Sequence, residues 1–269
     1  MESRYRQEVA KFGKKDGILA LCVWLAYILF SIAFVAIRGI FSMPFYLNLV
    51  VTIVVTSLQA GAIFLIVSRN KQGLSSIGLH KEKIWPAIRL GLLFCLIPIL
   101  FTAVIPGILG GFHAPLIGVL FINLVTTFFF AAHEDVIFVG FIQTRLYGLF
   151  KSDKLAIPAG ALLFAFMHIP PWLIMGHIDT SNLLASLGPP FLGWFLMHLV
   201  FVSIFKKHFS LLPVFILHTI NNYSWNFAQT NTIGGIDFSI ILLSLYALAA
   251  GILFWHMHRQ SKKATTEYA

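Results

Sequence analysis

The stretch 124-LVTTFFFAAHEDVIFVGFIQ-143 places three ionisable residues, His133, Glu134 and Asp135, inside an otherwise apolar run. A run of about 20 apolar residues is long enough to cross a bilayer, and an ionisable side chain at that depth is costly unless it has a task. The segment therefore predicts a transmembrane helix that carries a functional site.

The composition of the whole chain is that of a polytopic membrane protein. Of its 269 residues, 58% are hydrophobic and only 11% are charged, whereas a soluble domain carries roughly 25% charged residues. The fold class we predict is all-α, a transmembrane helical bundle of about eight spans. The apolar segments that supply these spans are 17–37, 44–68, 87–106, 115–144, 155–175, 183–205, 210–229 and 236–257.

The basic residues orient these spans. With the spans so placed, all but one of the 19 Lys and Arg residues fall on the same side of the membrane, and Arg38 is the exception. By the positive-inside rule both termini are then cytoplasmic. The predicted organisation is a cytoplasmic tail over 1–16, a single transmembrane domain over 17–257 and a second cytoplasmic tail over 258–269.

The same bias explains the net charge of +9, which suits contact with anionic lipid head groups and requires no nucleic acid. The expected partner is therefore the lipid bilayer, and nucleic acid is not expected. No small-residue cleavage site follows the first apolar run, so a removable signal peptide is not expected either. Short loops and the absence of appended domains favour a multi-pass protein of a bacterial plasma membrane.

Polar residues in three predicted spans lie at similar depths. Counted at about 1.5 Å per residue from the nearest cytoplasmic basic residue, Glu134, His168 and His218 lie roughly 16, 21 and 16 Å into the membrane. His218 and Asn222 are spaced i,i+4 and share a helix face. This agreement in depth predicts one shared site in or near the cytoplasmic half of the bilayer.

Helical facing supports the same site. At 100° per residue, Asn123, Thr127 and Arg145 point within about 20° of the direction of Glu134, which makes a polar stripe on an otherwise apolar helix.

One carboxylate, two imidazoles and a carboxamide suit the hydrolysis of an amide. A glutamate beside a histidine can take a proton from water and later deliver it to a leaving amine. A second histidine with an asparagine can donate hydrogen bonds to the oxyanion of a tetrahedral intermediate. Glu134, His168 and His218 could also hold a zinc ion with one open position, and their spacing does not exclude this alternative.

Three short motifs on separate predicted helices carry a resemblance to a known family. They are 134-EDVIFVG-140, Phe164-Ala-Phe-Met-His168 and His218-Thr-Ile-Asn-Asn222. The chain resembles the CPBP intramembrane proteases, named for CAAX proteases and bacteriocin-processing enzymes and also called the Abi family, whose motifs are EExxxR, FxxxH and HxxxN. The flanking FVGFIQ is similar to the family's FRGFLQ, and the resemblance covers about residues 75–230.

The resemblance implies an intramembrane endopeptidase that cleaves a peptide or a membrane-attached protein. Glu134 would activate water with help from His168, and His218 and Asn222 would form the oxyanion hole. Phe164 would support His168. The family has been described both as metalloproteases and as metal-free glutamate proteases. We expect no cofactor, because these four residues already supply both functions, and zinc bound by Glu134, His168 and His218 is the alternative.

Two positions depart from the family pattern. The second glutamate is Asp135, and Val139 stands in place of the arginine. Without that counter-charge, Asp135 is expected to be neutral or paired with another group such as His133, which we interpret as a local partner and not a catalyst. The departures leave two alternatives open: a catalytically impaired family member that acts as a membrane scaffold or bacteriocin-immunity protein, and a small transporter.

Overall fold

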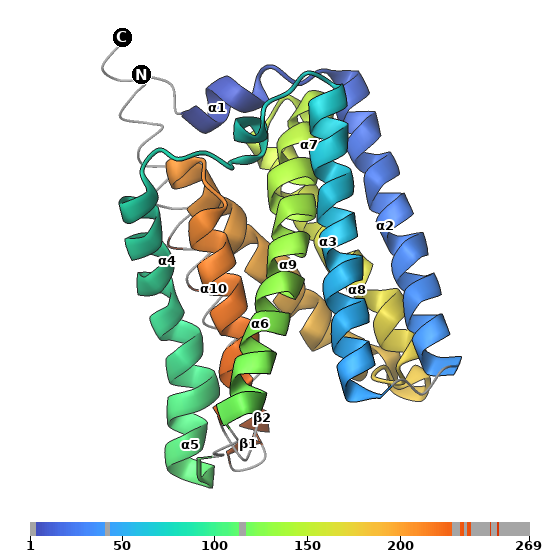
Figure 1. Ribbon diagram of the computed structural model, residues 1–269, viewed down its shortest axis with the longest axis vertical. Coiled ribbons are helices and arrows are strands. Elements are labelled where there is room, and N and C mark those ends of the chain that lie inside the picture. Colours follow the sequence, from blue (N-terminus) through green and yellow to red (C-terminus); the bar gives the residue numbers. More distant parts are fainter. Residues whose placement is uncertain are drawn as a thin grey trace.

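The chain folds into a bundle of long helices in a computed structural model that describes residues 4–40, 44–112, 117–227, 232–233, 236–237, 248 and 252 (Figure 1). The all-α class predicted from the sequence is confirmed, apart from one antiparallel pair of two-residue strands. The α-helices are α1 (Arg4–Val9), α2 (Lys14–Ile40), α3 (Phe45–Arg69), α4 (Ile84–Pro98), α5 (Ile105–Gly110), α6 (Ile117–Glu134), α7 (Gln143–Phe150), α8 (Asp153–Ile174), α9 (Leu183–His208) and α10 (Leu212–Tyr223). The short elements are the 3-10 turns η1 (Leu74–Ile77), η4 (Thr180–Asn182) and η5 (Ser224–Phe227), the π-helices η2 (Ile99–Val104) and η3 (Asp135–Ile142), and the strands β1 (Thr232–Ile233) and β2 (Ile236–Asp237).

Six helical segments in the described part of the chain are long and apolar enough to cross a membrane. They are Lys14–Gly39, Leu47–Arg69, Ile84–Gly110, Ile117–Phe150, Asp153–Ile174 and Thr180–His208. The seventh predicted span contains α10, which has only 12 residues and is shorter than the roughly 20 that a perpendicular crossing needs. Most of the eighth predicted span, 236–257, lies outside the described residues, so the total of about eight stays a prediction.

Lipid-facing side chains explain why so apolar a chain leaves much apolar surface uncovered. Leu25, Leu58 and Leu96 on α2, α3 and α4 are each more than half exposed. In water such surfaces would be a liability, but in a bilayer they contact hydrocarbon while the helices satisfy their own backbone hydrogen bonds. Inside the bundle, α2 packs on α7 and α8, α3 packs on α6, and α10 packs between α4 and α6.

The segment α6–η3–α7 is the central helix of the bundle, and residues 135–142 within it are π-helical. All eight of these residues are buried. Because a π-helix bonds i to i+5, the spacing of 100° per residue does not hold through this region. The predicted stripe that joined Glu134 to Arg145 therefore cannot be extended across it.

Arg145 fastens one end of the bundle. Its guanidinium is buried, donates to Gln72 Oε1 at 2.6 Å and to Ser76 Oγ at 2.9 Å, and lies against the rings of Phe12 and Phe141 at 4.3 and 4.5 Å. These contacts hold the loop after α3 and the connection between α1 and α2 against the central helix. α1 lies across the same end of the bundle, where the predicted N-terminal tail is partly helical (Figure 1).

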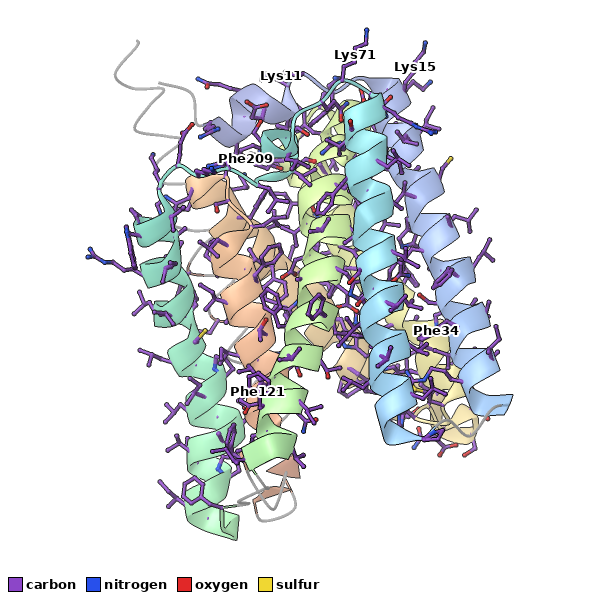
Figure 2. All side chains as sticks on the ribbon, viewed as in Figure 1. Lys11, Lys15, Phe34, Lys71, Phe121 and Phe209 are labelled. Atoms are coloured by element: carbon purple, nitrogen blue, oxygen red, sulfur yellow. The ribbon has the colours of Figure 1, made fainter. Side chains whose placement is uncertain are left out.

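Basic side chains gather at this end. Figure 2 shows Lys11, Lys15 and Lys71 there, with Phe34 and Phe121 toward the other end. We refer to the end marked by Lys11, Lys15 and Lys71 as the basic end, and the positive-inside rule assigns it to the cytoplasm.

The orientation predicts the outcome of reporter fusions. Fusions at Gly73 and Ser152 should report the cytoplasm, and fusions at Gly110 and Asn182 should report the outside, as measured with paired reporters that are active on opposite sides. A cytoplasmic signal at Asn182 would contradict the assignment.

Candidate active site

Glu134 and Asp135 lie at the junction where α6 becomes the π-helix η3. Both side chains are buried, with 3% and 0% of their surface exposed. The backbone stays helical through Glu134, at φ −61° and ψ −45°, so the two carboxyl groups project from consecutive positions of one continuous helix. π-Helical segments occur frequently at functional sites. The structure therefore places both acids in the interior of the bundle, as the sequence predicted.

His218 on α10 lies between these two acids. Its Nδ1 donates to Asp135 Oδ1 at 3.0 Å, and its Nε2 is 3.7 Å from Glu134 Oε2. The first distance is a hydrogen bond, and the second is too long for one. The ring is itself buried and lies 4.9 Å from the ring of Phe201. A histidine from a helix 83 residues further along the chain is thus the partner of Asp135.

Asp135 is thus paired with another group, as one of the two expectations had it, but the partner is His218 and not His133. His133 Nδ1 donates to the carbonyl of Phe129 at 3.3 Å, and its Nε2 accepts from the hydroxyl of Tyr27 at 3.2 Å. Both hydrogen bonds turn the ring away from the neighbouring acid and toward α2. His133 orients Tyr27. No sequence pattern singled out this residue, because a tyrosine in an apolar span is ordinarily a packing residue.

His168 is held in a defined orientation on α8. Its Nδ1 donates to the carbonyl of Phe164 at 2.9 Å, which leaves Nε2 as the nitrogen that can accept a proton. The ring of Trp194 stacks on it, with centroids 4.4 Å apart and planes 12° from parallel. Phe164 lies edge-on against His168 at 4.9 Å. The phenylalanine and the histidine of the FxxxH spacing are thus in direct contact.

A second buried histidine supports Phe164 from the other side. His198 on α9 stacks on Phe164 at 4.9 Å, and its Nε2 lies 3.3 Å from Gln143 Oε1. Gln143 in turn donates to the carbonyl of Ala156 at 3.0 Å. Sequence reasoning missed His198, although a histidine within an apolar span was a signal that could have found it.

A cavity of about 240 Å³ lies next to Glu134 and His168. Helices α2, α3, α6 and α8 line it, and Tyr27 and His133 also contribute to its wall. Glu134 lies 3.7 Å from His218 and also lines the cavity. It therefore connects the Asp135–His218 pair to the cavity.

Asn222 follows His218 by one helical turn and is half-buried, and its Oδ1 accepts from Asn221 Nδ2 at 3.0 Å. Neither His218 nor Asn222 is among the residues that line the cavity. Of the predicted site residues, the structure brings Glu134, Asp135 and His218 together and places His168 on the same cavity as Glu134. His218 reaches that cavity only through its contact with Glu134, and Asn222 has no contact of this kind with a cavity-lining site residue.

Within the described residues, no three His, Cys, Asp or Glu side chains come together in an arrangement that could hold a metal ion. Zinc held by Glu134, His168 and His218 stays the alternative that the sequence left open, since the nitrogen of His218 that faces Glu134 is not the one bonded to Asp135.

Comparison with known proteins finds that part of the chain is similar to a protease family. A model described as type II CAAX prenyl endopeptidase Rce1-like matches residues 113–224. This segment is Rce1-like. The match contains all three motifs, lies within the 75–230 resemblance predicted from the sequence, and confirms the resemblance to the CAAX protease family. The Rce1-like family is a family of membrane proteases, and the match therefore supports a protease. No curated protein and no solved structure matches the chain significantly.

Val139, at the position of the family's arginine, is fully buried in the hydrophobic core. The second oxygen of Asp135, Oδ2, is buried without a hydrogen-bond partner. The chain thus replaces a charged residue with a packed aliphatic one and pairs Asp135 through a single oxygen.

V139R should therefore destabilise the protein by several kcal/mol, because it places a long charged side chain in a packed apolar site. V139M is the matched control, since it adds length without charge and should cost less. Thermal unfolding in detergent measures both. An arginine variant as stable as the methionine variant would mean that the guanidinium reaches Asp135 Oδ2, and our account of this position would be wrong.

Proposed function

We propose that the chain is an intramembrane endopeptidase that hydrolyses a peptide bond with water activated by Glu134 and His168. The observation that carries the proposal is that Glu134 and His168 line one cavity inside the bundle. The Rce1-like match supports the reaction class, and this support does not depend on the cavity. The substrate class we propose is a peptide or a membrane-attached protein.

In the proposed reaction a water molecule lies in the cavity between Glu134 and the carbonyl carbon of the substrate. The Glu134 carboxylate takes one proton as the water oxygen attacks that carbon, and the bond that forms is C–O. The C–N bond then breaks, and the leaving nitrogen receives the proton from Glu134. His168 assists through Nε2, which its Nδ1 bond to Phe164 leaves free to accept a proton.

His218 and Asn222 are proposed to stabilise the oxyanion. When both ring nitrogens of His218 carry protons, Nδ1 donates to Asp135 and the proton on Nε2 is directed toward the Glu134 side of the site. The Asp135 carboxylate then balances the positive charge of the His218 ring. Because Val139 replaces the family's arginine, Asp135 has no arginine on its own helix to pair with and can pair with His218 instead. Neither His218 nor Asn222 lines the cavity, so in this proposal both side chains shift toward it when the oxyanion forms.

Removing the groups that activate water should abolish cleavage. E134Q and H168A are expected to lower the rate by at least 10²-fold, in line with the loss of a general base, without changing the unfolding temperature by more than a few degrees. The assay is cleavage of quenched fluorescent peptides by purified protein in lipid nanodiscs. H208A and E82Q, which change residues that do not line the cavity, are the matched controls and should retain activity.

The same preparation tests the metal-free mechanism that we propose. Activity should survive exhaustive chelation, and the purified protein should carry no stoichiometric zinc. Zinc near one per chain, with activity lost on its removal and restored on its return, would favour the metalloprotease alternative. Full activity in E134Q would contradict the proposed function itself, and a wild-type protein that cleaves no peptide would favour the scaffold or immunity reading.

A further inference from the structure

The cavity extends from Glu134 toward the end of the bundle opposite the basic end. On α2 its lining residues run from Tyr27 through Phe34 to Arg38, near the end of that helix. On α8 they run from Met167 to Met175, just beyond the last helical residue. Figure 2 shows Phe34 far from Lys11, Lys15 and Lys71 (Figure 2).

Toward the basic end, the site is covered by packed side chains. All of residues 135–142 are buried, and beyond them Arg145 is clamped by Gln72 and Ser76. Gly140 is packed so closely that an added Cβ would lie 2.9 Å from the carbonyl oxygen of Ile77. A peptide therefore has a route to Glu134 along the cavity and none through this packing.

Arg38 is the basic residue on the cavity wall. It is exposed, its guanidinium carbon lies 5.6 Å from the ring centre of Phe34, and it forms no salt bridge within the part of the chain that the structure describes. The sequence places Arg38 alone on this side of the membrane, away from the other 18 basic residues. A cation without an acidic partner, next to a cavity that leads to Glu134, is suited to bind an anion.

We propose that Arg38 binds a carboxylate of the peptide substrate, and that the peptide enters from the end of the bundle opposite the basic end. This inference rests on the proposed function, because the cavity is taken to hold the scissile bond at Glu134. The substrate feature that Arg38 would recognise is a carboxylate at a fixed distance from the cleaved bond.

The length of α2 sets that distance. Tyr27 marks the level of the reacting groups, since its hydroxyl bonds to His133, the residue before Glu134. Arg38 is eleven residues further along the helix, which corresponds to about 16 Å. An extended peptide covers about 3.3 Å per residue, so the carboxylate should lie about four to six residues from the scissile bond.

Two sources could supply this carboxylate, the C-terminus of the peptide or an acidic side chain. The experiment uses one peptide core in four forms. The first ends in a free C-terminal acid five residues beyond the scissile bond, and the second is the same peptide with an amidated C-terminus. The third and fourth are amidated peptides that carry a glutamate at the fifth and at the first position beyond that bond. Binding of the labelled peptides is measured by fluorescence anisotropy to the E134Q protein in phosphatidylcholine nanodiscs, so that no cleavage is needed.

We expect a carboxylate at the fifth position to tighten binding about tenfold over the neutral amide, and a glutamate at the first position to have no such effect. R38Q should remove the tenfold difference. R69Q, which removes an exposed arginine at the basic end of α3, is the matched control and should preserve it. Tighter binding of the free acid alone identifies the C-terminus as the carboxylate that Arg38 binds. Tighter binding of both the free acid and the peptide with glutamate at the fifth position shows that either carboxylate can bind.

Equal binding of all four peptides, or a preference that survives R38Q, would overturn the inference. Cleavage by the wild-type protein is measured with the same peptides. If the preference is present and depends on Arg38 while no peptide is cleaved, the binding site stands and the proposed function fails. If all four peptides are cleaved with equal kcat/KM, the proposed function stands and the Arg38 inference fails.

Discussion

The hydrogen bond between His218 Nδ1 and Asp135 Oδ1 is the contact on which the rest of the site depends. Both groups are buried in the bundle, where an unpaired ionisable side chain would be costly. The bond fixes α10 against the junction of α6 and η3, and it leaves the other nitrogen of His218 facing Glu134. It therefore determines where Glu134 lies relative to the cavity, and so where water can be activated.

Aromatic packing holds the second half of the site. His168 is bonded to its own helix through Nδ1 and stacked on Trp194, so its ring has little freedom to rotate. Phe164 is fixed between Phe138 and His198, at 5.4 and 4.9 Å. The two halves of the site come from helices that meet at the central segment α6–η3–α7. Any change that shifts this segment should alter both halves together.

Much of the arrangement could be predicted from the sequence. The apolar segments predicted the bundle, the asymmetry of Lys and Arg predicted a basic end, and the depth of Glu134, His168 and His218 predicted that three helices converge. These predictions rest on length, composition and spacing, which tertiary contacts do not change. The Rce1-like match to residues 113–224 supports the same motifs independently.

The pairing within the site could not be predicted, because it depends on tertiary geometry. His133 is adjacent to the acids in the sequence, but helical spacing turns it toward Tyr27, and His218 reaches Asp135 from a distant helix. The π-helix of residues 135–142 also changed the facing that an ideal helix implies. Tyr27 and Trp194 carry no sequence signal, since aromatic residues are ordinary in apolar spans.

A double-mutant cycle between Asp135 and His218 tests the central claim most directly. D135A, H218A and the double variant are compared by the free energy of unfolding in detergent. The account predicts that the two substitutions are not additive, with a coupling energy of about 1–3 kcal/mol, because each single change leaves the other buried group without its partner. Additive effects, with a coupling energy near zero, would show that the pair does not hold the site together and would contradict the account.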